Sequence, residues 1–375
     1  MVFVENENPG VVQTFIELVS IPSPSGEEAK VGEYIKERLK KEGIDSDFDG
    51  SGSKNDSDSG NLIAKVDGRG PTVMFLTHMD TVEMGRTVPV IDGDTIRTDG
   101  NSILGADNKA SVAPLMHAII DAKKLQNRPR IIAAFTTHEE NGSMGAKYLD
   151  IGEHVDYVFV VDGAKSVGTF ITKALGQMPF LVDIYGKEVH AAVNPDKGAN
   201  AIRAAGLAIS KLEIGRADDG STINVGTISG GTVVNVVPGR VTMKVEVRAY
   251  EQKRIQERFE SVEREVAEAC RKTNCTYTIK TLENDGAAAF SISPSDGIVS
   301  LAKRASLKSG LEFSLGALDG TCEANVLVGK FDSIIAMGRG GKMPHSRSES
   351  ITKMELLQTE RLLLEIIKAA TDNLQ

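Results

Sequence analysis

The sequence is poor in cysteine and in long apolar runs, and each shortage excludes a class of protein. Its 375 residues include only three cysteines, Cys270, Cys275 and Cys322, and no Cys-x-x-Cys motif. This usage excludes a disulfide framework and a thiolate zinc site, and it is typical of a reducing compartment. No apolar run approaches the length that spans a membrane.

Basic blocks and a leader-like N-terminus are missing as well. The formal net charge is −9, and no cluster of lysine and arginine stands out, so we expect no nucleic-acid partner. The first ten residues lack the basic start and apolar core of a signal peptide. We therefore expect a cytoplasmic protein that acts without a membrane partner.

What the chain does contain predicts two α/β domains. A length of 375 residues exceeds the size at which a single core usually stops growing. Strands and helices alternate over residues 61–163 and again from residue 295, which predicts a mixed, largely parallel sheet between helices. Residues 178–281 instead follow the ferredoxin-like order β-α-β-β-α-β. The predicted domains are residues 1–175 with 294–375, and an inserted domain of residues 176–293.

Polar side chains that can bind metals follow several of the predicted strands. His78 and Asp80 come directly after the apolar run 73–76 and, being two apart, project from the same face of an extended chain. The carboxyl ends of parallel strands meet at one edge of a sheet, where open α/β folds place their ligands. Further candidates lie at other strand ends or open a helix: Asp107, Glu139, Glu140, Asp162 and His345.

Each candidate has a structural explanation when it is considered alone. His78 could be an ordinary buried histidine, Asp107 a helix N-cap and His345 a surface residue. Four separate strand ends with ligand chemistry make coincidence a poor explanation. Histidines and carboxylates at one edge of the sheet are suitable ligands for two divalent ions. Zinc is the expected metal, with manganese or cobalt as alternatives. Such a pair can polarise a carbonyl and activate a bridging water, while one of two adjacent glutamates serves as general base.

Short motifs in a fixed order extend this pattern over nearly the whole chain. They are THMDTV from Thr77, GADNKA from Gly105, THEENGSMGAK from Thr137, VVDG from Val160, GKEVHAA from Gly186, NVGTISGGTVVNVVPG from Asn224, VEVRAY from Val245, EAN from Glu323 and PHSRSE from Pro344. In this order and spacing, the chain resembles the M20 dinuclear metallopeptidases, most closely their peptidase T-like branch.

The resemblance implies a metal ligand at each matching position. His78 and Asp162 would hold one ion, and Glu140 and His345 would hold the other. Asp107 would bridge the two ions.

The resemblance also implies catalytic and substrate-binding residues. Glu139 would be the general base, and Asp80 would orient His78 through its other ring nitrogen. His190, in the inserted domain, would reach an active site, often that of the partner subunit, and stabilise the oxyanion. The residues that would bind the substrate are Arg248, Asn235 and Asn325.

The implied activity is metal-dependent hydrolysis of short peptides, with removal of the N-terminal residue of tripeptides. The inserted domain would serve as a lid and would form a homodimer. The same ligands would serve an N-acyl amino acid deacylase or a carboxypeptidase, so both stay open as alternatives. Glu323 departs from the family pattern, which has aspartate in the corresponding glycine-rich segment.

Two local predictions concern the N-terminal part of the chain. Ser25, with Glu28 three residues on, predicts a capping box for a helix that runs through Leu39. Residues 45–60 are rich in aspartate, serine and glycine, which predicts a flexible surface loop and not a calcium site.

Overall fold

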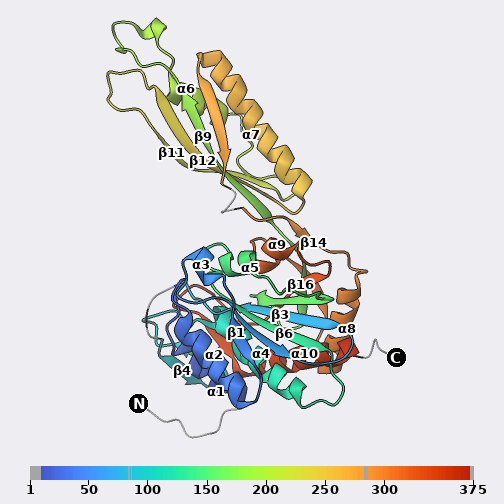
Figure 1. The fold of residues 1–375 in the computed structure, drawn as a ribbon. Coiled ribbons are helices and arrows are strands. Elements are labelled where there is room, and N and C mark those ends of the chain that lie inside the picture. The colour runs from blue at the N-terminus through green and yellow to red at the C-terminus, as the bar shows by residue number, and fades with distance from the viewer. Residues whose placement is uncertain (1–9, 83–84, 86, 283–285, 372–375) are drawn as a thin grey trace. The chain divides into compact units, whose positions relative to one another are not determined.

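The computed structural model describes residues 10–82, 85, 87–282 and 286–371, which divide into two compact units (Figure 1). The first unit comprises the described residues up to Thr172, Ile292–Ala317, and those from Cys322 onward. The second unit comprises Lys173–Ser291 and Leu318–Thr321. Each unit encloses a hydrophobic core of its own.

A mixed sheet forms the centre of the first unit. Its spatial order is β1 (Ser46–Phe48), β2 (Leu62–Val66), β6 (Arg130–Thr136), β3 (Thr72–His78), β7 (Tyr157–Gly163), β16 (Ile334–Gly338), β8 (Thr169–Ala174) and β14 (Phe290–Ser291), and β15 (Ser314–Leu318) also pairs with β8. The central strands β6, β3, β7 and β16 are parallel, whereas β2 and β8 run antiparallel to their neighbours. This arrangement confirms the predicted mixed, largely parallel sheet.

Helices cover the sheet, and this explains the composition of its central strands. Every residue of β3 is buried, and apolar residues follow one another in β3, β6 and β7 as they do in strands covered on both faces. In Figure 1 the longer helices α1, α2, α4 and α10 lie on one side of the sheet, and the short helices α3, α5 and α9 lie toward the other. Among the described residues, no helix is both long and apolar enough to cross a membrane. The helices of this unit are α1 (Gly10–Val19), α2 (Ala29–Lys41), α3 (Gly52–Asn55), α4 (Ala106–Lys123), α5 (Met144–Tyr148), α8 (Gly297–Ser309), α9 (Glu323–Leu327) and α10 (Lys353–Thr371).

A small antiparallel sheet links distant parts of the first unit. It consists of β4 (Pro89–Asp92), β5 (Thr95–Thr98) and β17 (Ser350–Thr352) in the order β17-β5-β4. Because Ile351 pairs with Ile96, the segment that follows His345 is fixed beside the hairpin that precedes α4.

The second unit is one antiparallel sheet with two helices packed on it. Its spatial strand order is β10-β11-β12-β9-β13. The elements follow one another along the chain as β9 (Gly176–Tyr185), α6 (Ala201–Ile209), β10 (Gly215–Arg216), β11 (Thr222–Gly230), β12 (Arg240–Ala249), α7 (Gln252–Thr273) and β13 (Thr276–Thr281). Apart from the two-residue β10, this order is consistent with the predicted ferredoxin-like unit.

The predicted capping box is wrong. α2 begins at Ala29, and Glu28, at its N-cap, makes no side-chain capping bond. Ser25 Oγ instead donates to Asp80 Oδ2 at 2.6 Å, and the buried Glu28 Oε1 accepts from the amide of His138 at 2.9 Å. Both side chains therefore support strand ends of the central sheet and not the helix.

The prediction of a flexible loop over residues 45–60 is also wrong. The segment contains β1 and α3, and Asp49 Oδ1 accepts hydrogen bonds from the amides of Ser51 and Asn61, each at 2.9 Å. The side chain of Asn61 continues this network, because its Nδ2 donates to Gly145 O at 3.0 Å. The aspartates and serines that suggested disorder by composition form local turns, which these short polar side chains favour.

Candidate metal centre

The ends of four central strands and the start of α4 bring the predicted ligands together. His78 Nε2 lies 3.4 Å from Asp107 Oδ1 and 3.4 Å from Asp162 Oδ1. His345 Nε2 lies 3.3 Å from Asp107 Oδ2 and 2.9 Å from Glu140 Oε1. The side chains therefore form two adjacent clusters, and each oxygen of the shared Asp107 faces one of them.

Unsatisfied oxygen atoms in these clusters fit divalent cations. His78, Glu139 and Asp162 offer ligand atoms within 4.8 Å of one another, and so do His78, Asp107 and Glu140. Within the described part of the chain, Asp107 Oδ1 and Glu140 Oε1 are buried and have no well-aligned hydrogen-bond donor. Because a buried carboxylate oxygen without a donor is costly, a bound cation would compensate the charge that collects here. The residues present thus fit two divalent ions on either side of Asp107.

The concentration of carboxylates shifts the pKa values of both histidines upward. Burial would lower the pKa of His78, but the charge of Asp162 and hydrogen bonds to Asp107, Asp162 and Asp80 outweigh burial and hold that pKa well above its usual value. Hydrogen bonds to Asp107 and Glu140 raise the pKa of His345 to about 10. A metal ion must displace protons from both rings, so we expect metal affinity to increase with pH.

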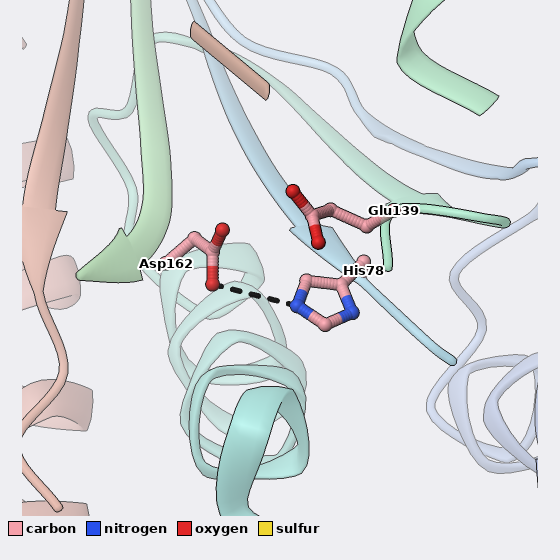
Figure 2. A group of neighbouring side chains, drawn as sticks. All are labelled: His78, Glu139 and Asp162. Atoms are coloured by element: carbon pink, nitrogen blue, oxygen red, sulfur yellow. Dashed lines mark ion pairs between the residues drawn. The ribbon is translucent and has the colours of Figure 1, made fainter. Parts of the chain in front are cut away.

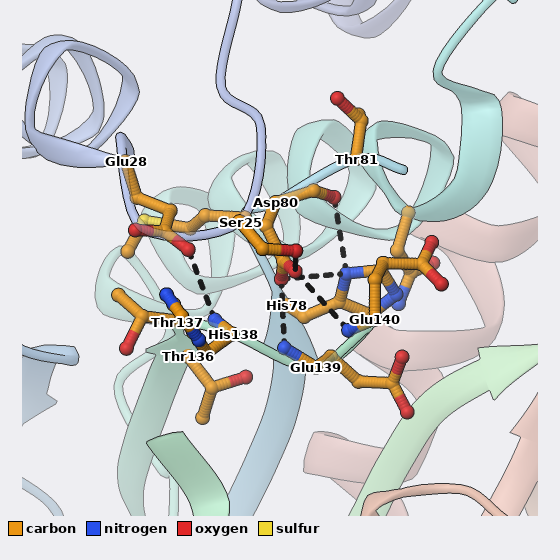
Figure 3. A network of polar contacts seen from close by, with 12 residues as sticks. Ser25, Glu28, His78, Asp80, Thr81, Thr136, Thr137, His138, Glu139 and Glu140 are labelled. Carbon is orange, nitrogen blue, oxygen red and sulfur yellow. Dashed lines mark hydrogen bonds and ion pairs between the residues drawn. The ribbon is translucent and has the colours of Figure 1, made fainter. Parts of the chain in front are cut away.

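Asp80 joins His78 to the turn that carries Glu139 and Glu140 (Figure 3). Its Oδ1 lies 3.2 Å from His78 Nδ1 and accepts from the amide of Glu139 at 3.0 Å. Its Oδ2 accepts from the amide of Glu140 at 3.1 Å and from Ser25 Oγ at 2.6 Å. One buried carboxylate therefore orients an imidazole and also fixes the backbone of both glutamates.

The side chain of Glu139 lies beside His78 and Asp162 (Figure 2). Its Oε1 accepts a hydrogen bond from Ser143 Oγ at 3.2 Å. Burial, together with the charges of Asp162, Glu323 and Glu140, raises the pKa of Glu139 well above its usual value despite the opposing charge of His78. A carboxyl group with a raised pKa next to the ligand cluster is suited to accept and return a proton.

Two further charged side chains, Arg339 and Glu349, contact the bridging position. Arg339 Nη2 lies 2.8 Å from Asp107 Oδ1, and Glu349 accepts from the amides of Gly105 and Asp107 at 2.7 and 2.9 Å. Sequence reasoning assigned neither residue a role. Arg339 could have been found from the sequence, because it directly follows the apolar strand β16, just as His78 lies at the end of β3.

The α9 segment is buried against the same sheet. Glu323 Oε1 accepts from Thr136 Oγ1 at 2.5 Å, and burial raises the pKa of Glu323 to about 8. Asn325 Oδ1 accepts from the amide of Cys322 at 2.9 Å, so this predicted substrate ligand also closes the first turn of α9.

Comparison with known proteins identifies the family. A peptidase dimerisation domain model, named for M20, matches residues 173–274, and an M42 glutamyl aminopeptidase model matches residues 82–175. Aminopeptidase PepT from Bacillus cereus ATCC 10987 is 30% identical in sequence, with a TM-score of 0.89, over 96% of this chain and 98% of that chain. The chain belongs to the M20 peptidase family. It is a metallopeptidase with peptidase T-like relatives, which makes it a hydrolase.

Two other similar proteins also align along almost the full chain of this M20 metallopeptidase. A tripeptidase from Staphylococcus aureus is 26% identical, with a TM-score of 0.87, over 96% of this chain and 98% of that chain. Protein YqjE of Bacillus subtilis is 31% identical over 366 residues, which cover 96% of this chain and 98% of that protein.

The second unit of the M20 metallopeptidase carries the other predicted functional residues. His190 and Asn235 are exposed neighbours, because the amide of Ala191 donates to Asn235 O at 2.9 Å. Arg248 Nε donates to Glu246 Oε1 at 2.7 Å on the same strand. All of them lie within or beside the elements that the dimerisation model covers, and their roles stay predictions.

Proposed function

We propose that this M20 metallopeptidase is an aminopeptidase that releases the N-terminal residue of tripeptides. We propose that it uses two divalent ions, with zinc preferred over manganese or cobalt. The observation that carries the proposal is a double ligand cluster with Glu139 beside it, in a chain that aligns over 96% of its length with aminopeptidase PepT. The similarity to a tripeptidase from Staphylococcus aureus supports tripeptides as the preferred length of substrate. The proposed ligands are His78, Asp107, Glu140, Asp162 and His345.

The proposed chemistry assigns one task to each group. When bound, the two ions would polarise the scissile carbonyl and make the attacking water molecule more acidic. Glu139 accepts a proton from the water that attacks the peptide carbonyl and gives a proton to the leaving amine. Asp80 keeps His78 and the backbone of Glu139 in place throughout.

The second unit would complete the site on the substrate side. His190 donates a hydrogen bond to the oxyanion, and Arg248 and Asn235 bind the backbone or carboxylate of the peptide. Asn325, from the first unit, contacts the same substrate. We propose that residues 176–293 form the lid and that two chains associate through it, since the dimerisation model matches residues 173–274.

A carboxypeptidase or N-acyl amino acid deacylase is the second candidate. A probable carboxypeptidase of Aspergillus flavus is 27% identical over 263 residues, which cover 62% of this chain. The hydrolytic step is common to all these enzymes, so the metal ligands do not separate them. Glu323, at the altered glycine-rich segment, is the feature that leaves the substrate class open.

Hydrolysis of a free tripeptide, beside its N-acetylated form, tests the proposal. Metal-stripped protein would receive zinc, manganese or cobalt, and the products would be identified by mass spectrometry. We expect cleavage of the free peptide alone, with release of its first residue. Release of acetate or of the last residue would favour the second candidate, and no cleavage with any metal would contradict the peptidase assignment.

A further inference from the structure

Arg339 is a fully buried cation in contact with the predicted bridging ligand. It follows β16 and is 1% exposed, and its Nη2 lies 2.8 Å from Asp107 Oδ1. Its backbone amide donates to Gly163 O at 2.9 Å, next to Asp162. A guanidinium keeps its charge in a protein interior, so this position holds a permanent positive charge beside the ligand cluster.

The contact between Arg339 and Asp107 is a close, buried ion pair. Among the described residues, neither Arg339 Nη2 nor Asp107 Oδ1 has a well-aligned hydrogen-bond partner, although the two atoms are close. Arg339 therefore supplies positive charge to this carboxylate oxygen from one side and does not occupy all of its lone-pair directions. This oxygen can accept a cation while the guanidinium stays where it is.

The surrounding backbone is shaped to keep the guanidinium in this place. Arg339 Nη1 donates to Gly340 O at 3.2 Å, and a Cβ at Gly341 would lie 3.1 Å from Nη1. Gly340 has a φ of 80°, and a Cβ there would lie 2.7 Å from the side chain of Glu355. The glycines on the C-terminal side of Arg339 are thus explained by close packing, not by a phosphate-binding loop.

The two metal positions have the same ligand types but different distances to this charge. The first position offers His78, Asp162 and Asp107 Oδ1, the oxygen that contacts Arg339. The second offers His345, Glu140 and Asp107 Oδ2. Each set contains one imidazole and two carboxylates, and they differ in burial, since His78 is 1% and His345 47% exposed, and in the fixed charge of Arg339.

We propose that Arg339 is a positioning residue that acts as an internal counter-ion for Asp107 and makes the two metal positions unequal. In the metal-free protein it neutralises part of the carboxylate charge and keeps Asp107 in its bridging orientation. Toward an incoming cation it is repulsive, and the repulsion is larger at the first position. The second position, with Glu140 and His345, therefore binds metal first and more tightly. This inference requires the two-metal site of the proposed function but not its substrate.

Calorimetric titration of metal-stripped full-length protein with Co²⁺ tests this order. The wild type should bind two ions in two unequal steps. Arg339→Met removes the charge at similar side-chain length, so it should strengthen the weaker step by about tenfold or more. Arg339→Lys retains the charge and should keep the two steps apart. The inference would be overturned if Arg339→Met had the same two dissociation constants for Co²⁺ as the wild type. It would also be overturned if Arg339→Met bound Co²⁺ more weakly.

Matched ligand variants identify which position responds. Glu140→Gln leaves the first position intact and Asp162→Asn leaves the second, and each replaces one carboxylate with an amide. In an otherwise wild-type background, the remaining site of Asp162→Asn should bind Co²⁺ more tightly than that of Glu140→Gln. Adding Arg339→Met should strengthen binding mainly in the Glu140→Gln variant. The reverse order of affinities would overturn the assignment even if the Arg339→Met protein did not fold.

Thermal unfolding gives a readout that does not depend on binding constants. Arg339→Met should lose more thermal stability than Arg339→Lys when metal is stripped, and Co²⁺ should restore more of it. An equal loss in both variants, not restored by metal, would reduce Arg339 to a packing residue. A wild type that binds no metal would overturn the metal centre itself, whereas unchanged binding in Arg339→Met would overturn only the role of Arg339.

Discussion

The two units hold their functional side chains in different ways. In the first unit, His78 and Asp80 are 1% and 0% exposed, and partners from several strands and loops fix them. In the second unit, His190 and Asn235 are exposed, and Arg248 bonds to a neighbour on its own strand. The side chains proposed for hydrolysis are thus held rigidly inside one unit, whereas His190 and Asn235, proposed for substrate contacts, are exposed on the other.

The largest effect should come from a substitution in the first unit, at Glu139. Glu139→Gln should lower turnover by about a thousandfold, since it removes a general base but keeps the shape of the side chain. Metal content and melting temperature should stay near those of the wild type. Steady-state kinetics with a tripeptide, beside metal analysis, provides the measurement. Glu33→Gln, on the exposed face of α2, is the control, and wild-type turnover in Glu139→Gln would refute the base assignment.

A smaller loss of turnover is expected from a substitution in the second unit, at the exposed His190. His190→Ala should lower turnover by about a hundredfold, because it removes one oxyanion donor, and should leave metal binding unchanged. Mixing it with Glu139→Gln should restore part of the activity if the histidine acts in the partner subunit. With subunit exchange confirmed, no recovery would place His190 in the site of its own chain.

The network behind the site should be sensitive at Ser25. Ser25→Ala removes the hydroxyl that donates to Asp80 Oδ2, so His78 and the glutamate turn lose one restraint. We expect metal affinity and turnover to fall by about tenfold each. Equilibrium dialysis with Zn²⁺ measures the first and peptide hydrolysis the second. Ser53→Ala, at an exposed serine of α3, is the control and should change neither quantity. If Ser25→Ala also left metal affinity and turnover unchanged, the hydrogen bond from Ser25 to Asp80 would have no role in the site.

The smallest effect should be one of stability alone. Asp49→Ala leaves the amides of Ser51 and Asn61 without their acceptor, which should lower the free energy of unfolding by about 2 kcal/mol. Asp47→Ala is the matched control, since the side chain of Asp47 is 91% exposed and its ion pair with Lys36 contributes little. Urea unfolding of both variants makes the comparison. Equal stabilities would mean that the hydrogen bonds of Asp49 do not stabilise the fold of residues 45–60.

Much of the first unit was predictable because its chemistry follows its strands. The apolar run before His78 predicts a buried parallel strand, and parallel strands must end at one edge, so the positions of His78, Glu140 and Asp162 follow from local pattern and topology together. The shortest strands, such as β14 and β17 with two and three residues, are too short to show a period.

The errors arose where a local motif had a stronger distant partner. Ser25 and Glu28 have the spacing of a capping box, but Ser25 bonds to the buried carboxylate of Asp80 instead. Arg339 was missed for the same reason, because nothing near it in the chain indicates Asp107. A sequence shows which side chains are available to a site, but contacts between residues far apart along the chain appear only once it has folded.

The contacts of Glu349 with Gly105 and Asp107 set the time at which the centre can be completed during synthesis. The residues they join are 244 and 242 positions apart in sequence. A ribosome that adds about ten residues per second needs some tens of seconds to make the intervening chain. For most of that interval the nascent polypeptide carries His78, Asp107 and Glu140 but lacks Arg339, His345 and Glu349. An unfinished chain therefore cannot yet form the complete site proposed for two metals.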